Sequence, residues 1–329
     1  LDSAATLLGM PDSRHWVLLA NHADKTLLRN DVTFEVGRQL GMAWTPRSRD
    51  VQVRLNGGYD GVYQLTEHIR IASDRVNIDE LDAAVTSEPD ITGGYLLQID
   101  ELALGAPRCF TTAVAQVTIC GEDPEDLDAR PAQRAYISGY VQSAENALYS
   151  ADFASATAGY AAYIDVDSAI QYFLANELVK NVDGNLQRST YLFKPRGGKL
   201  HFGPLWDFDL AIGNATYDGA PDPQGWYIRN APWFARMFED PAFAARVAQE
   251  WREMKRDGRL DALLAYVDRR AIELGDAQAR NFERWPILDV NIFANVPMPM
   301  PNSYDAEVAY MRRFLVDRIA WLDSQLGGP

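Results

Sequence analysis

The spacing of apolar residues changes once along this chain, from the two-residue period of strands to the longer period of helices. In the first third, Val51-Gln-Val-Arg-Leu55 alternates strictly and ends at Asn56-Gly57-Gly58, which predicts a hairpin whose return strand covers 61–71. From about residue 123 onward, apolar residues recur three and four positions apart, as in amphipathic helices. Strands followed by helices predict an α+β protein.

The same patterns predict the remaining elements. Helices are expected over 25–40, 131–148, 166–181, 241–255, 260–274 and 304–326. Strands are expected over 95–100 and 111–119, paired with each other, and over 190–194 and 200–205 on either side of a turn. Two unequal lobes over 1–122 and 123–329 would produce this order, with the hairpin region 181–214 in the second lobe. A single α+β domain would produce it too.

Charge and hydropathy restrict the partners of the chain. Its 31 Lys and Arg against 46 Asp and Glu leave a formal charge of −15, which disfavours nucleic acid and anionic lipid and fits a soluble protein or one with basic partners. No apolar run approaches the roughly 18 residues of a membrane span. With 47% hydrophobic residues, the 329-residue chain has enough apolar surface for a large core.

The chain has two cysteines, Cys109 and Cys120, on either side of the expected strand 111–119. They are too few for a zinc site of the paired-cysteine type. A disulfide formed in an oxidising compartment and two buried free thiols both fit this spacing. The chain starts at Leu1 rather than at a methionine, so we expect a further segment upstream of it.

Glu67 is the first residue whose position is not explained by packing. On the expected return strand it shares a face with Tyr63, Leu65 and Ile69. A carboxylate on an apolar face needs a cationic partner or a metal.

The densest polar group in an apolar setting is Trp206-Asp207-Phe208-Asp209, directly after a predicted buried strand. Two carboxylates at such a place need a positive neighbour, and Mg²⁺ binds one or two carboxylates together with phosphate oxygens. A turn Asp beside a salt-bridged Asp is the simpler alternative. A second acidic loop, with Asp183, lies 24 residues earlier, at the other open end of the predicted hairpin. Protein kinases place a hydroxyl-orienting Asp and a metal-binding Asp in this way, although Asp183 alone also fits an Asx-turn.

Other patterns are less specific. The four histidines are scattered, and no Gly-rich phosphate-binding motif occurs. Aromatic residues near the hairpin fit either an adenine-stacking surface or the core: Tyr191, Phe202 and Trp206. The aromatic and Pro-rich stretch 218–233 is a long connection, and such connections are often functional.

The chain resembles the spore-coat protein H (CotH) kinase-like family of bacterial atypical protein kinases. The resemblance rests on blocks at 15–30, 53–67 and 75–78, then on Asn181-Val-Asp-Gly, Ser189-Thr-Tyr-Leu-Phe-Lys194 and 198–214. It implies a bilobal kinase-like fold with ATP and Mg²⁺ or Mn²⁺ in the cleft.

The resemblance also implies roles for individual residues. Asp183 matches the catalytic-loop Asp, and Asp207 matches the metal-binding Asp, with Asp209 as its helper. The family often has an Asn five residues after the catalytic Asp. Here Arg188 holds that place, so Asn185 or Gln187 would substitute and Arg188 would contact phosphate. Further expected members of the nucleotide site are Trp206, Lys25 and the family's Glu67, paired with Lys25 or Arg29.

Taken together, these features favour an atypical protein kinase. It would transfer the γ-phosphate of ATP, with a metal, to Ser or Thr of a surface or coat protein with basic character, outside the cell or at its surface. The main alternative is a pseudokinase-like surface assembly or carbohydrate-associated module without phosphotransfer. A third possibility is a glycan hydrolase with Asp183 and Asp207 as its acid pair.

Overall fold

The computed structural model describes residues 1–292 and 301–328 and confirms an α+β protein. The strands are β1 (Ala5–Leu7), β2 (Met10–Ser13), β3 (Trp16–Leu19), β4 (Ser48–Leu55), β5 (Gly58–Glu67), β6 (Tyr95–Ile99), β7 (Cys109–Thr111), β8 (Thr118–Asp123), β9 (Thr190–Lys194) and β10 (His201–Phe202). The α-helices are α1 (Arg29–Gln39), α2 (Pro131–Leu148), α3 (Val166–Val179), α4 (Pro232–Met237), α5 (Pro241–Arg256), α6 (Arg259–Arg284) and α7 (Tyr304–Leu326).

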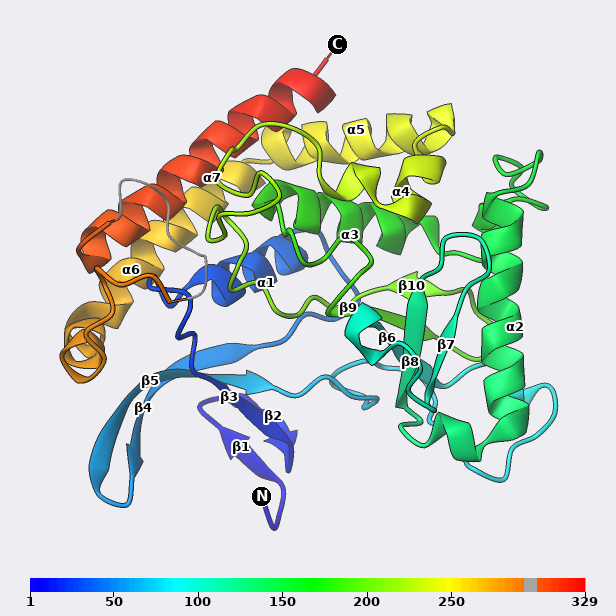
Figure 1. The fold of residues 1–329 in the computed structure, drawn as a ribbon, viewed down its shortest axis with the longest axis horizontal. Helices are drawn as coiled ribbons and strands as arrows, with labels where there is room; N and C mark the ends of the chain where they lie inside the picture. The colour runs from blue at the N-terminus through cyan, green and yellow to red at the C-terminus, as the bar shows by residue number, and fades with distance from the viewer. Residues whose placement is uncertain (293–300, 329) are drawn as a thin grey trace.

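The predicted first hairpin is the centre of a three-stranded antiparallel sheet, in the order β3-β5-β4. Leu55 pairs with Gly58 across the turn, where Asn56 and Gly57 both adopt positive φ, as a two-residue hairpin requires. The return strand ends at Glu67, four residues earlier than predicted. This sheet lies beside α6, and α1 lies between it and α3 (Figure 1).

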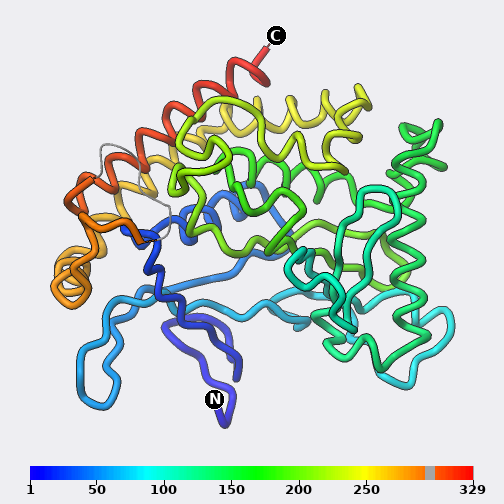
Figure 2. The backbone as a smooth tube through the Cα atoms, in the orientation of Figure 1, coloured from blue at the N-terminus to red at the C-terminus, as the bar shows by residue number. Residues whose placement is uncertain are grey.

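A five-stranded antiparallel sheet, in the order β10-β9-β6-β8-β7, joins residues 95–123 to residues 190–202. Figure 2 shows it between α2 and the rest of the chain. The predicted strand 111–119 is wrong: β7 ends at Thr111 and β8 begins at Thr118, because Thr112 closes a turn with Val117 through two hydrogen bonds. β6 pairs with β8, and Cys109 and Cys120 lie opposite each other in a disulfide.

Most predicted helices are confirmed, and their apolar faces form the main core. α6 continues ten residues beyond its predicted end at 274, after a non-helical Gly275. α1 begins at Arg29 rather than at 25, because the Asp24 carboxylate accepts hydrogen bonds from the backbone N–H groups of Thr26 and Arg29 and holds a turn there. Within the described ranges, no helix is both long and apolar enough to cross a bilayer.

Candidate active site

Asp183 lies in the loop that connects α3 to β9. The Asx-turn predicted for Asp183 is instead made by Asn181, whose side-chain oxygen accepts from the Asp183 N–H (3.3 Å). A side chain at Gly184 would come within 2.5 Å of the Asn181 amide and 2.7 Å of the Asn176 amide, so this close approach requires glycine. The Asp183 carboxylate is therefore not used to build its own loop.

The Asp183 carboxylate has one hydrogen-bond partner among the described side chains, Tyr217, whose hydroxyl donates to Oδ1 (3.2 Å). Burial raises the pKa of Asp183, and the Asp207 carboxylate adds to the rise, while Tyr217 and Arg188 oppose it. A partly buried carboxylate with a raised pKa is a candidate proton acceptor in a functional site.

Asp207 and Asp209 follow the β9–β10 hairpin, as predicted. Asp207 is exposed, adopts a left-handed φ of 66°, and accepts a hydrogen bond from the Ser189 hydroxyl (2.9 Å). The Asp209 carboxylate has no hydrogen-bond donor among the described residues. Burial raises the pKa of Asp209 to about 7, and Asp207, Asp24 and Asp183 contribute. Asp207 and Asp183 are among the charges that raise the pKa of Asp209, so the three predicted aspartates, 183, 207 and 209, are close enough to influence one another.

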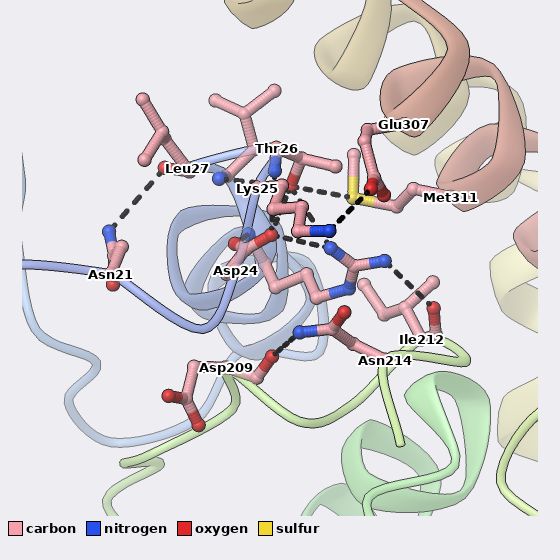
Figure 3. Close-up of polar contacts among 12 residues, drawn as sticks. Asn21, Asp24, Lys25, Thr26, Leu27, Asp209, Ile212, Asn214, Glu307 and Met311 are labelled. Carbon is pink, nitrogen blue, oxygen red and sulfur yellow. Dashed lines mark hydrogen bonds and ion pairs between the residues drawn. The ribbon is translucent and has the colours of Figure 1, made fainter. Parts of the chain in front are cut away.

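The start of α1 positions the Asp207–Asp209 loop. Asn30 accepts a hydrogen bond from the Phe208 N–H at 2.7 Å, and Asn214 donates to the Asp209 carbonyl at 2.5 Å. Figure 3 shows the Asp209 side chain pointing away from Asn214. Asn30 and Asn214 therefore hold the backbone of the loop and leave the carboxylates of Asp207 and Asp209 free to bind a ligand.

Arg29 is fully buried and also supports this loop. Its guanidinium pairs with Asp24 (2.5 Å) and donates to the carbonyls of Ala211 (3.0 Å) and Ile212 (3.4 Å). Lys25, also buried, donates to the Leu288 carbonyl and lies 3.7 Å from a carboxylate oxygen of Glu307.

The predicted pairing of Glu67 with Lys25 or Arg29 is wrong. Glu67 is fully buried, as its face predicted, but its cationic partners are Arg47 (2.7 Å) and Arg75 (3.7 Å). Arg47 also donates through Nε to the second carboxylate oxygen of Glu67 at 2.8 Å, which makes the pair bidentate.

The remaining predicted residues are Arg188, Asn185, Gln187 and Trp206. Arg188 pairs with Glu101 at 2.9 Å, and both side chains are exposed by 43%. The Asn185 amide oxygen is buried and has no hydrogen-bond partner among the residues that the structure describes. The Gln187 side chain is exposed, and the half-buried Trp206 ring stacks against Phe34 in the core with centroids 6.4 Å apart.

A separate cleft of about 700 Å³ lies between α1, β4 and α6. Its lining does not include Asp183, Asp207 or Asp209. Its charged residues neutralise one another: Arg270 donates to Asp31 (2.8 Å) and Asp50 (2.5 Å). We therefore place the candidate site at the three aspartates.

Comparison with known families identifies the family of the chain but does not address its site residues. The profile of the family described as CotH kinase protein matches residues 2–322, nearly the whole chain. The chain belongs to the CotH kinase protein family. No curated protein sequence matches it.

The donor set of this CotH family member fits a divalent cation. Within the described residues, no three His, Cys, Asp or Glu side chains form a ready-made metal cage. Mg²⁺ does not need one, because it binds through one or two carboxylates and takes its other ligands from phosphate and water. The Asp209 carboxylate and the buried Asn185 amide oxygen, which have no hydrogen-bond partner among the described residues, are oxygen donors of the type that Mg²⁺ binds.

Sequence reasoning missed three residues of the site: Ser189, Tyr217 and Glu101. Only Tyr217 had a nearby signal, because the predicted functional connection begins at the next residue. A further signal is structural: six of the eleven described non-glycine residues with positive φ fall between Lys180 and Asp218. Backbone strain of this kind concentrates at functional sites.

Proposed function

We propose that this CotH family member is a metal-dependent atypical protein kinase that transfers the γ-phosphate of ATP to a Ser or Thr hydroxyl. The observation that carries the proposal is the arrangement of its aspartates. Asp183 precedes β9, Asp207 and Asp209 follow β10, and the two groups are electrostatically coupled. This is the division of work between a hydroxyl-orienting Asp and metal-binding acids in kinases.

In the proposed reaction, Asp183 orients the acceptor hydroxyl and takes its proton. The acceptor oxygen forms a bond to the γ-phosphorus, the bond from that phosphorus to the bridging oxygen breaks, and ADP leaves. Asp207, Asp209 and Asn185 would hold Mg²⁺ or Mn²⁺. A bound cation supplies neutralisation of phosphate charge.

Other residues of the site have supporting roles in this proposal. The exposed Arg188–Glu101 pair contributes little to stability, so Arg188 is free to turn towards phosphate. We place Gln187 and Trp206 next to the nucleotide. Lys25, Arg29 and Glu67 are buried and paired within the protein, so we assign them to positioning rather than to direct contact.

The proposal includes a two-lobed arrangement over 1–122 and 123–329, with the five-stranded sheet crossing this boundary. It also includes a location outside the cell or at its surface, supported by the Cys109–Cys120 disulfide, which oxidising compartments favour. The formal charge of −15 supports a basic, Ser- or Thr-bearing protein substrate.

The test is calorimetric titration of ATP, with and without Mg²⁺ or Mn²⁺, combined with a transfer assay on a basic Ser-containing peptide. Asp207→Asn should abolish metal-dependent ATP binding. Asp183→Asn should keep binding but lose transfer by at least about a hundredfold. Asp128→Asn, an exposed aspartate in another region, is the matched control and should behave as wild type.

Two results would refute the kinase proposal. Wild-type transfer by Asp207→Asn would remove the metal role. Absence of ATP binding by the wild-type chain would favour the alternative, a surface assembly or carbohydrate-associated module, for which Arg188 at the place of the expected Asn is the specific argument.

A further inference from the structure

The connection after Asp209 is held in place by buried cations. Lys180, at the end of α3, is buried and has a left-handed φ of 47°; its ammonium donates to three carbonyls, of Gly219 (2.9 Å), Asp222 (2.6 Å) and Gln224 (2.7 Å). Arg318 of α7 donates to two more, of Pro223 (2.8 Å) and Gly225 (2.7 Å). Five hydrogen bonds from charged donors fix this connection relative to the Asp183 loop.

Tyr217 lies in this connection, and both its ring and its hydroxyl have defined contacts. The ring packs against a small apolar cluster that contains the neighbour of Asp183, with members Val182, Leu210, Ala215 and Ala220. The hydroxyl donates to Asp183 Oδ1 at 3.2 Å. Burial and the nearby Asp183 carboxylate raise the pKa of Tyr217 to about 12, so the phenol stays protonated and remains a donor.

Asp183 therefore already has a hydroxyl donor where the proposed function requires an acceptor hydroxyl. We infer that Tyr217 is a specificity-determining residue of the acceptor site: its phenol takes the place of the acceptor hydroxyl in the free protein and must turn aside when a Ser or Thr enters. This inference rests on the proposed function, and it adds a residue that competes with the acceptor.

Two consequences follow from this competition. A weakly bound hydroxyl, such as that of water, must compete with the phenol for Asp183 Oδ1, so ATP hydrolysis is slowed while the phenol remains there. An acceptor must displace the phenol with binding energy from the rest of its chain, so isolated hydroxyl compounds are poor acceptors. Because the backbone of the connection is anchored, only the side chain of Tyr217 needs to move, and Tyr217 stays close to Asp183.

The test compares Tyr217→Phe with Tyr227→Phe in the full chain. Tyr227 lies in the same connection and donates its hydroxyl to Asp218 (3.2 Å) rather than to Asp183, so it is a matched control. The assays are ATP hydrolysis without acceptor, and kcat and KM for transfer to a synthetic Lys- and Arg-rich peptide with one serine. Thermal unfolding verifies that both variants are folded.

For Tyr217→Phe we expect ATP hydrolysis to rise about fivefold and the peptide KM to fall about fivefold, with kcat unchanged, because a hydrogen bond to a charged group has been removed. The control should change neither quantity. An unchanged hydrolysis rate and KM, or a raised KM, in an active Tyr217→Phe variant would overturn this inference alone. A wild-type chain without hydrolysis or transfer would overturn the proposed function and this inference with it.

Discussion

Replacing Arg318 by Met tests whether one buried ion pair fixes the connection beside the site. Arg318 and Glu177 are both fully buried, and Arg318 Nη2 lies 2.6 Å from Glu177 Oε1. Arg318 also donates to three backbone carbonyls, and Glu177 accepts from the N–H groups of Tyr227 and Arg229. Met keeps the apolar length of the side chain and removes every one of the Arg318 hydrogen bonds.

The expected loss follows from this burial. Removing one partner of a buried ion pair costs about 3–5 kcal/mol, because the other charge stays buried without compensation. An unfolding entropy of about 2.1 cal/mol/K per residue gives about 0.7 kcal/mol/K for 329 residues. The melting temperature of Arg318→Met should therefore fall by about 4–7 °C.

The loss should also depend on pH. Burial raises the pKa of Glu177, while Arg318 and the two backbone donors lower it. Without Arg318 the folded-state pKa rises further above the unfolded value of about 4.5. A raised folded-state pKa means that stability is lost as the pH rises, so the deficit should be smallest near pH 5 and largest near pH 8.

The assay is thermal and urea unfolding at several pH values, with Arg312→Met as the control on the same helix. Arg312 has one exposed partner, Asp268 (2.8 Å), and its loss should cost less than about 1 kcal/mol. An Arg318→Met variant no less stable than Arg312→Met, or a deficit that shrinks with rising pH, would refute the reasoning.

Two further predictions concern other parts of the structure. Burial raises the pKa of Asp50 from 3.8 to about 6, so the free energy of unfolding should fall by about 3 kcal/mol as the pH rises through this interval. Urea unfolding of Asp50→Asn at several pH values should lack this fall. Parallel pH profiles for the variant and the wild type would contradict the prediction. Asn30→Ala removes the acceptor for the Phe208 N–H, so metal-dependent ATP binding measured by calorimetry should weaken about tenfold. An unchanged affinity would show that the Asp207–Asp209 loop holds its shape without Asn30.

Local periodicity was sufficient to predict most elements of the fold. The β9 strand and the α7 helix have their predicted bounds, because period, caps and turn residues all agree there. The prediction of a strand over 111–119 was wrong, because alternating residues can also form a turn when the Thr112 hydroxyl accepts a hydrogen bond from the Val117 N–H. Alternation shows which residues can share a face, but it does not show where pairing stops.

The candidate site was predictable in its acids but not in their partners. Asp207 and Asp209 were predicted because two charges after a buried strand need an explanation, and Asp183 because its loop leads into the same hairpin. The cations that pair with Glu67 were missed, because ion-pair partners are chosen by tertiary contact. Arg47 reaches Glu67 across the sheet, from the residue just before β4. Tyr217 was missed for the same reason, since the functional connection predicted from residue 218 onward does not indicate a contact with Asp183, 34 positions away.

The two residues of the buried ion pair that supports the site, Glu177 and Arg318, lie 141 positions apart in the sequence. During synthesis, the ribosome therefore releases the segment with Asp183, Asp207 and Tyr217 long before the cation that fixes it. Until α7 emerges, Glu177 lacks its ion-pair partner and the connection after Asp209 lacks two of its five hydrogen bonds from charged donors. The nascent chain thus acquires its complete candidate site only after most of the chain has been made.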